Sequence, residues 1–298
     1  MRRCASRGVY DRGKSAGDPP LSCLAQAVLA EEAGFPKGAI NVITTLDSVS
    51  DVGQALCSNK MVRKLGFTGT WWKQSFIVFD DASIDTAIQA CIMAKFRNSG
   101  QTCVTANRIF VQKGIYEKFT NALIDKVRAL KVGSGIEDGV HVGPLTHERA
   151  VGKAMDHIED ARKHGAEVVL GGAPLETLPG YFLQPTIIKD MNASMKMTCE
   201  ETFAPVVGLY KFETEEEAIQ RANDCDVGLG GFICTENISR MWRVAEALEV
   251  GMVGVNLGML SACESPFGGI KESGYGRELG HYGIDEYLAV KSMIGVGV

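Results

Sequence analysis

Residues Phe96-Arg97-Asn98-Ser99-Gly100-Gln101-Thr102-Cys103 join two stretches of different hydrophobic pattern. Before them, residues 84–95 carry apolar side chains at helical spacing, which predicts a helix. After them, Arg108-Ile109-Phe110-Val111 has the composition of a strand. Backbone amides at such a junction favour the thiolate of Cys103, the form that attacks carbonyl carbon. Judged alone, a cysteine of this kind is more often a buried core residue.

Short elements alternate along most of the chain. Periodicity predicts helices over 21–33, 49–57, 84–95, 115–130, 147–164, 214–223 and 238–248. It predicts strands over 40–43, 65–67, 76–79, 108–112, 166–170, 183–188, 204–212, 230–234 and 252–255. This alternation is typical of an α/β fold with a parallel sheet, and 298 residues are enough for two compact units.

The alternation breaks down between residues 70 and 75. The strand expected at 65–67 is followed almost at once by Phe76-Ile77-Val78-Phe79. Parallel neighbours need a crossover of about a dozen residues or more, and this connection is too short for one. It also lacks the Asn-Gly or Gly-x pair of a tight hairpin. We infer that an element expected here is missing from the chain.

Composition narrows the functional classes. Apolar residues make up 45% of the chain, the net charge is −5, and basic residues form no stripe, so we expect no nucleic-acid partner. No window approaches the roughly 18 apolar residues of a membrane span. The nine cysteines include no C-x-x-C pair, which argues against a metal knuckle or a disulfide framework and favours free thiols in a reducing compartment.

Three separated motifs resemble those of the aldehyde dehydrogenase family. Residues 96–103 are similar to its nucleophile loop. Residues 200–206, Glu-Glu-Thr-Phe-Ala-Pro-Val, resemble its E-E-x-F-G-P-V cofactor segment, with Ala204 where glycine is usual. Residues 266–278 resemble its P-F-G-G-x-K-x-S-G-x-G-R-E signature. The resemblance runs from about Pro20 to the C-terminus and implies that family's fold, with a partial Rossmann-type cofactor domain and an α/β catalytic domain.

Within the family, Lys95-Phe96-Arg97-Asn98 and the segments 250–256 and 282–287 are similar to members that oxidise succinate semialdehyde. In those members the residues matching Arg97 and Ser261 hold the distal carboxylate of the substrate. A guanidinium fork can bind a carboxylate bidentately, which suits that role. Without the resemblance, Arg97 would be assigned to a surface ion pair and Ser261 to a turn.

The resemblance implies an oxidation of succinate semialdehyde, or a similar short carboxy-aldehyde, through a cysteine adduct. The Cys103 thiolate gives a thiohemiacetal, hydride leaves to NAD or NADP, and the resulting thioester is hydrolysed. Glu201 is implied to bind the nicotinamide ribose, with Phe203 packed nearby. Gly69 and Thr70 match the start of the glycine-rich cofactor turn. Judged by itself, Glu201 is an ordinary exposed glutamate. No metal is implied.

The sequence also departs from the family. The E-L-G-G segment, whose glutamate activates water for thioester hydrolysis, falls in the gap at 70–75, and no glutamate lies between Glu32 and Glu117. The N-terminal part is expected to be missing, together with an oxyanion-stabilising asparagine and the residues that would distinguish NAD from NADP. Activity is therefore an open expectation. The alternative is a catalytically impaired chain that acts as a non-catalytic partner of full-length relatives.

The resemblance suggests the following organisation. Residues 1–18 form a transit peptide or a disordered or anomalous N-terminus, 19–93 a partial NAD-binding domain, 94–265 the catalytic domain, 266–286 a return segment and 287–298 an oligomerisation strand. A homo-oligomer would form through that last strand. Mitochondrial or cytoplasmic location and a place in GABA degradation are further implications, and the oligomer number stays open.

Overall fold

Residues 76–78 of the apolar run form most of strand β3 (Gln74–Val78), an interior strand of a seven-stranded sheet. The other strands of this sheet are β4 (Ala106–Gln112), β5 (Glu167–Leu170), β6 (Thr186–Lys189), β7 (Val206–Phe212), β9 (Gly230–Cys234) and β10 (Met252–Val255). Their order is β10-β9-β3-β4-β7-β6-β5, and only the β5–β6 pair is antiparallel. The expected α/β class with a mostly parallel sheet is confirmed.

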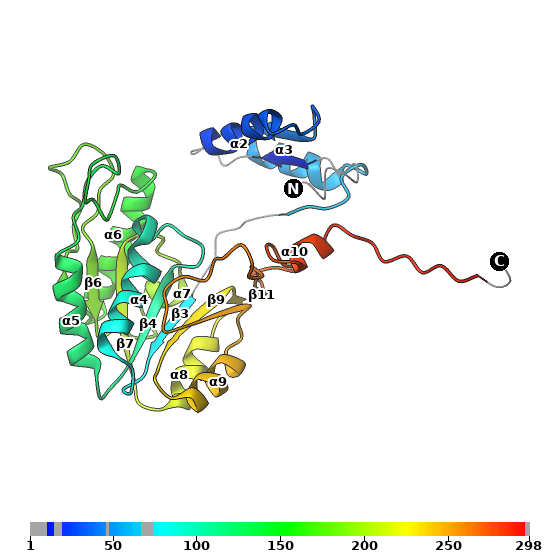
Figure 1. Ribbon diagram of the computed structural model, residues 1–298. Helices are drawn as coiled ribbons and strands as arrows, with labels where there is room; N and C mark the ends of the chain where they lie inside the picture. Colours follow the sequence, from blue (N-terminus) through cyan, green and yellow to red (C-terminus); the bar gives the residue numbers. More distant parts are fainter. Residues whose placement is uncertain (1–10, 15–19, 46–47, 67–73, 296–298) are drawn as a thin grey trace. The chain divides into compact units, whose positions relative to one another are not determined.

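Helices cover both faces of the sheet (Figure 1). The helices of this unit are α4 (Ile84–Phe96), α5 (Tyr116–Arg128), α6 (Glu148–Lys163), α7 (Lys196–Cys199), α8 (Glu215–Asn223) and α9 (Ile238–Ala247). Phe76 and Val78 pack in the core with α4 and α5, whereas Ile77 and Phe79 pack with α6, α8 and α9. Successive side chains of a strand point to opposite faces, so a strand covered on both sides is apolar throughout.

The structure is a computed structural model that describes residues 11–14, 20–45, 48–66 and 74–295. The chain divides into a smaller unit, Met1–Thr68 with Gly283–Val298, and a larger unit, Gly69–Tyr282. The larger unit includes residues 74–93, which the sequence had suggested belong with the cofactor domain. The reason is that β3 pairs with β4 and β9, so the polypeptide from Gln74 onward is part of the large sheet.

The remaining short elements of the larger unit lie outside its main sheet. A 3-10 turn, η1, covers Arg97–Gly100, and β8 (Val227–Gly228) pairs antiparallel with β11 (Ile270–Lys271). Helix α10 (Tyr282–Asp285) spans the boundary between the units. Within the segment expected to form an oligomerisation strand, the described residues 287–295 carry no strand.

The smaller unit contains β1 (Asp11–Lys14), α2 (Pro20–Glu32), β2 (Ile40–Ile43) and α3 (Val49–Ser58). Strands β1 and β2 pair in parallel, so residues 11–14 are ordered as a strand within the segment expected to be disordered or anomalous. The strand expected at 65–67 is absent at residues 65 and 66, and Phe67 lies outside the described residues. Lys64 donates to the backbone oxygen and carboxylate of Glu286, at 3.0 and 2.9 Å, which ties the two segments of the unit together.

Apolar side chains of the smaller unit are largely exposed. Leu21 and Met61 are 76% and 85% exposed, and Val28 and Leu29 are also exposed. Among the described residues of this unit, Ala39 is the buried hydrophobic residue. The helices of this unit form, but their apolar side chains are not buried against other residues of the unit. Little hydrophobic stabilisation therefore comes from within the unit.

A carboxylate at the carboxyl edge of the large sheet fixes the start of α9. Asp81 accepts hydrogen bonds from the Thr235 hydroxyl at 2.7 Å and the Asn237 amide at 2.9 Å, and it pairs with Arg240 at 2.6 Å. Burial raises the pKa of Asp81, but the bond from Thr235, the charge of Arg240 and the backbone amides outweigh burial and hold this pKa below its ordinary value.

We expect Asp81→Asn to lower the free energy of unfolding at neutral pH by about 1–2 kcal/mol, because a charge-assisted network is weakened. Since the folded-state pKa is depressed, this stabilisation is present above the unfolded-state pKa and is lost as pH falls through the lower folded-state pKa. Urea titrations of wild type and variant from pH 3 to 7 measure it, with Asp125→Asn on α5 as control. A difference between wild type and variant that stays constant across this range would contradict the prediction.

Candidate active site

The sequence-predicted nucleophile lies where three parallel strands begin. Cys103 precedes β4, the segment 200–203 precedes β7, and Gln74 opens β3. Strands β3 and β4 pair in parallel, as do β4 and β7, so these three entry points meet at one edge of the sheet. Binding sites in open α/β sheets more commonly lie at the carboxyl ends of the strands. Here the site is at the amino ends.

The loop that carries Cys103 is held in an uncommon backbone conformation. Asn98, Ser99 and Gly100 have φ values of 51°, 56° and 74°, a left-handed run that reverses the chain directly after α4. The Asn98 side chain donates to the Gln101 carbonyl at 2.9 Å, and Ser99 donates to the Gly143 carbonyl at 2.9 Å. The cost of left-handed backbone at non-glycine residues is thus offset by local hydrogen bonds and by contact with a second loop.

Gly100 also brings this loop against the cofactor-like segment. A Cβ at Gly100 would overlap the backbone carbonyl of Ala204 and crowd Pro205, so only glycine permits this approach. Two sequence motifs that are about one hundred residues apart therefore touch through their backbones. The contact fixes Cys103 relative to Glu201 and Phe203.

Cys103 itself is half-buried in a turn that is closed by a hydrogen bond from Thr105 to the Thr102 carbonyl at 2.9 Å. Burial raises the pKa of the thiol, the amides of Cys103 and Val104 lower it, the Glu201 carboxylate raises it and the Arg97 guanidinium lowers it. The net result is a pKa above the ordinary value. The amides favour the thiolate as the sequence suggested, but desolvation outweighs them.

A shallow hollow lies next to this turn. Its lining comprises Met93, Ala94, Arg97, Thr102, Val104, Thr105 and Gly258. Arg97 is exposed at its rim, at the end of α4. A Cβ at Gly258 would overlap the Ala90 carbonyl, so this glycine lets the loop after β10 lie directly on α4. Ser261 is exposed three residues further along that loop, and it is not among the lining residues.

Two buried ionisable side chains of opposite sign, Lys95 and Glu201, interact electrostatically. Lys95 is fully buried in the last turn of α4, and its Nζ lies 3.3 Å from the Asn107 side-chain oxygen. Glu201 is 6% exposed. Burial lowers the pKa of Lys95 to about 7, while the Glu201 carboxylate and Cys91 raise it. Glu201 acts electrostatically on both Lys95 and Cys103.

His157 connects α6 to the segment that carries Glu201. Its Nδ1 lies 3.1 Å from the Thr202 hydroxyl and its Nε2 lies 3.3 Å from Glu200. The ring is fully buried. Burial lowers the pKa of His157, and Glu200 raises it by less, so the neutral ring is the form favoured at pH 7. The histidine therefore orients both neighbours of Glu201.

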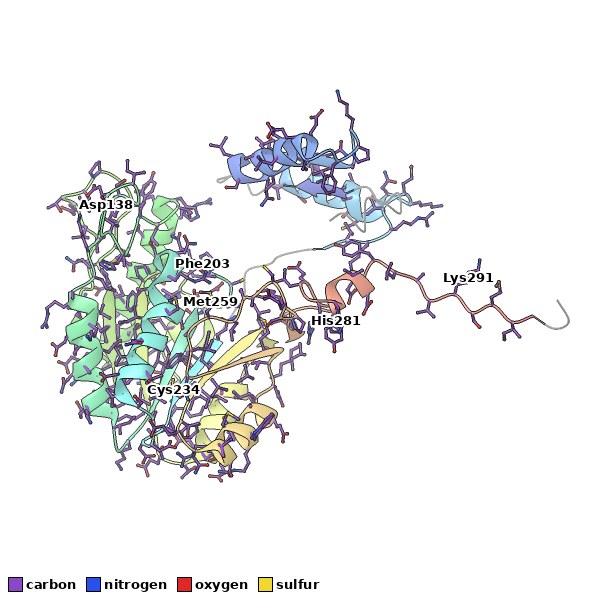
Figure 2. All side chains as sticks on the ribbon, in the orientation of Figure 1. Asp138, Phe203, Cys234, Met259, His281 and Lys291 are labelled. Carbon is purple, nitrogen blue, oxygen red and sulfur yellow. The ribbon has the colours of Figure 1, made fainter. Side chains whose placement is uncertain are left out.

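Most of the sequence-predicted site residues come together in the larger unit. Arg97, Cys103, Glu201 and Phe203 lie on adjoining loops, and Phe203 adopts a left-handed φ of 52° directly before Ala204. Figure 2 labels Phe203, on the loop before β7, and Cys234, the last residue of β9. Gly69 and Thr70 lie outside the described residues.

Three residues near Cys103 and Glu201, namely Lys95, His157 and Gln74, were given no site role from the sequence. Lys95 and His157 both occupy the apolar faces of their helices, four residues after Cys91 and three after Ala154, and that position was a signal of burial. Gln74 contacts the nucleophile turn, and nothing in its local sequence indicates this, because the contact crosses between strands. Among the described residues, no cluster of three His, Cys, Asp or Glu side chains is arranged for a metal.

Two general properties bear on the sequence predictions. Within the part of the chain that the structure describes, no helix is long and apolar enough to cross a membrane. The eight cysteines in that part are free, with Cys57, Cys199 and Cys263 exposed and Cys91 and Cys234 buried. Exposed thiols of the same chain are useful references for the reactivity of Cys103.

A sheet with helices on both faces defines an α/β protein. Its candidate site is centred on the half-buried Cys103 thiol, with the Arg97 guanidinium and the buried Glu201 carboxylate acting on it. The aldehyde dehydrogenase family model matches residues 13–71 and 73–293, and the chain belongs to this family. The match is interrupted only at residue 72, inside the gap that the sequence analysis identified.

Relatives and solved structures agree with this assignment. The chain is 48% identical to the mitochondrial succinate-semialdehyde dehydrogenase of Oryza sativa, over 91% of this chain and 55% of the relative. It is 44% identical to the glutarate-semialdehyde dehydrogenase of Pseudomonas putida, over 93% and 62%. A crystal structure of succinate-semialdehyde dehydrogenase from Burkholderia pseudomallei superposes with a TM-score of 0.89 at 42% identity, over 92% and 61%. The chain thus spans about three fifths of the length of these proteins.

We expect Gly100→Ala to destabilise the larger unit by about 2–4 kcal/mol, because it combines a left-handed φ with backbone overlap at Ala204. Urea denaturation followed by circular dichroism measures this. The control is Gly152→Ala inside α6, where an added Cβ meets nothing within 4 Å and should stabilise by about 0.5–1 kcal/mol. Equal effects of the two substitutions would refute the role given to the Gly100 contact.

Proposed function

We propose that the chain forms a covalent adduct with succinate semialdehyde, or a similar short carboxy-aldehyde, through Cys103. The observation that carries the proposal is the half-buried Cys103 with its own and the Val104 amide beside the sulfur and Arg97 on the same loop. The thiolate attacks the aldehyde carbon, and the oxygen becomes an oxyanion. Amide donors at such a position stabilise that developing charge.

The residues of the site fit a nicotinamide dinucleotide in part. Glu201 is a buried carboxylate that acts electrostatically on Cys103. An acceptor for the ribose hydroxyls near Cys103 would let the nicotinamide ring face the adduct. His157 orients the residues on either side of Glu201. When bound, the dinucleotide supplies the acceptor that takes the aldehyde hydrogen as hydride and leaves a thioester on Cys103. NAD and NADP both remain candidates, because the Escherichia coli relative is named for NADP(+) and a crystal structure of a Staphylococcus aureus relative contains NAD+.

Specificity for a carboxy-aldehyde rests on Arg97. Its guanidinium lies at the rim of the hollow beside the nucleophile turn, and it is exposed to incoming ligands. A distal carboxylate bound there would leave the aldehyde end directed at the thiol. Ser261 would add a hydroxyl donor from the neighbouring loop. Two relatives are named for succinate semialdehyde and glutarate semialdehyde, which are aldehydes with a distal carboxylate.

Hydrolysis of the thioester is the step for which this chain has the fewest catalytic groups. Between Glu32 and Glu117 the sequence has no glutamate to act as general base, and a missing base slows such a step about 10²–10⁴-fold. Acylation depends on Cys103 and the bound cofactor, whereas deacylation depends on activated water. Formation of the adduct should therefore outpace its hydrolysis.

We expect a burst of up to one NADH or NADPH per chain on mixing with cofactor and succinate semialdehyde, followed by a steady rate at least about 100-fold slower. Stopped-flow absorbance measures the burst, and mass spectrometry locates the acyl group on Cys103. Cys103→Ala should abolish both signals, whereas Cys199→Ala, which removes an exposed thiol of the same unit, should leave them unchanged. Absence of any burst at saturating cofactor would contradict the proposal.

The burst rate should also reveal the carboxylate contact. Arg97→Gln is expected to raise the half-saturating concentration of succinate semialdehyde about 10–100-fold, because a charge-assisted pair is lost. The half-saturating concentration of an uncharged aldehyde of similar length should hardly change. Arg128→Gln, on an exposed position of α5, is the matched control. Equal weakening for both aldehydes would remove Arg97 from the specificity site.

A second function is favoured by the exposed apolar tail. Val290, Met293 and Ile294 are at least 90% exposed, and the smaller unit exposes further apolar side chains. These surfaces fit a chain that pairs with subunits of full-length relatives without turnover of its own. Co-purification with a full-length relative, lost on deletion of residues 287–298, combined with no burst, would support this function over the first.

A further inference from the structure

Gln74 reaches the backbone of the nucleophile. It is the first residue of β3, it is 3% exposed, and its Nε2 donates to the Cys103 carbonyl oxygen at 2.6 Å. Its backbone pairs opposite Ala106, and the β3–β4 register shifts directly after Gln74. This irregularity turns the residue out of the regular pleat, so its side chain crosses to the turn that precedes β4.

The hydrogen bond from Gln74 is accepted by the peptide group between Cys103 and Val104, whose N–H acts on the Cys103 thiol. The Cys103 carbonyl and the Val104 N–H belong to one planar peptide unit and cannot rotate independently. The Val104 amide is one of the two amides that favour the Cys103 thiolate. An anchor on the carbonyl oxygen therefore also fixes the direction of that N–H.

We propose that Gln74 is a positioning residue for Cys103, which holds the 103–104 peptide plane so that the Val104 amide stays aimed at the sulfur. The proposal rests on the proposed role of Cys103 as a nucleophile. Gln74 does not touch the reacting atoms and acts only through the backbone.

The environment of Gln74 supports this assignment over a purely structural one. Its Oε1 is buried without a hydrogen-bond partner among the described residues, and the bond to Cys103 is the one that its side chain makes there. A buried acceptor without a partner destabilises the fold, so an apolar side chain of equal size would pack more favourably. What the amide contributes at this position is its donor, and that donor is directed at the nucleophile turn.

The charged groups that act on Cys103 are separate from this contact. They are Arg97 on the same loop and Glu201 on the segment before β7, with Lys95 acting on Glu201 from α4. Gln74 is neutral and lies on β3. Its replacement by another neutral side chain should therefore leave the charges in place and alter only the orientation of the amide.

The test is site-resolved alkylation of the full chain with iodoacetamide between pH 5.5 and 10.5, read by peptide mass spectrometry. Gln74→Met retains the side-chain length without a donor. We expect the midpoint of the Cys103 profile to rise by about one pH unit, since a hydrogen bond to a charged group is lost. At pH 7 alkylation should slow about three- to fourfold, because the more basic thiolate is also the stronger nucleophile.

Controls separate the possible outcomes. Gln112→Met removes a side-chain amide that bonds Asp80 and Glu213 at the opposite end of β4, and it should leave the Cys103 midpoint unchanged. Cys199 and Cys263 serve as references in every sample. A Gln74→Met midpoint equal to wild type, with the fold intact, would overturn the proposal.

Two further results are informative. If Gln74→Met does not fold, Gln74→Glu provides the second measurement: its carboxylate repels the Cys103 carbonyl, so the midpoint should rise at least as far, and an unchanged midpoint again overturns the assignment. If wild-type Cys103 resists alkylation over the whole range while Cys199 and Cys263 react, the proposed nucleophile fails, which is distinct from failure of the Gln74 assignment alone. Circular dichroism checks the fold of each variant.

Discussion

The backbone approach of Gly100 to Ala204 is the contact on which the site depends. It joins the loop after α4 to the loop before β7, at the amino ends of neighbouring parallel strands. Both loops contain left-handed non-glycine residues, Ser99 in one and Phe203 in the other. Such strain persists only where surrounding contacts over-determine the backbone. Because Gly100 has no side chain, the two loops can approach closely enough to make these contacts.

The groups that act on Cys103 differ in exposure. Arg97 is exposed, the thiol is half-buried, and Glu201 and Lys95 are buried. Burial raises the pKa of Cys103 and lowers the pKa of Lys95, so both groups are held closer to their neutral forms than in water. The backbone amides and the Arg97 guanidinium both lower the pKa of this thiol, so its thiolate depends on the alignment of those amides as well as on charge. Positioning residues are therefore as important to it as charged neighbours.

The two units of the chain differ in how completely they bury their own apolar residues. The larger unit has a seven-stranded sheet with helices on both faces and two extensive cores. The smaller unit has a two-stranded parallel pair and helices whose leucines and valines are exposed. Cys103, Arg97 and Glu201, the residues on which the proposed function depends, all belong to the larger unit. Chemistry at Cys103 can thus be tested separately from the question of what covers the smaller unit.

Sequence alone determined the class of fold and the family, and it predicted Cys103 as the nucleophile, because hydrophobic period and local motifs depend on neighbours along the chain. The strands at 230–234 and 252–255 and the Thr214 cap of α8 match the predicted positions. The tertiary structure alone decided three other points. It assigned β3 to the large sheet, it made burial prevail over the amides at the Cys103 thiol, and it brought Gln74 to the nucleophile. Strand pairing, desolvation and contacts between strands depend on groups far apart in sequence, so no local pattern contains them.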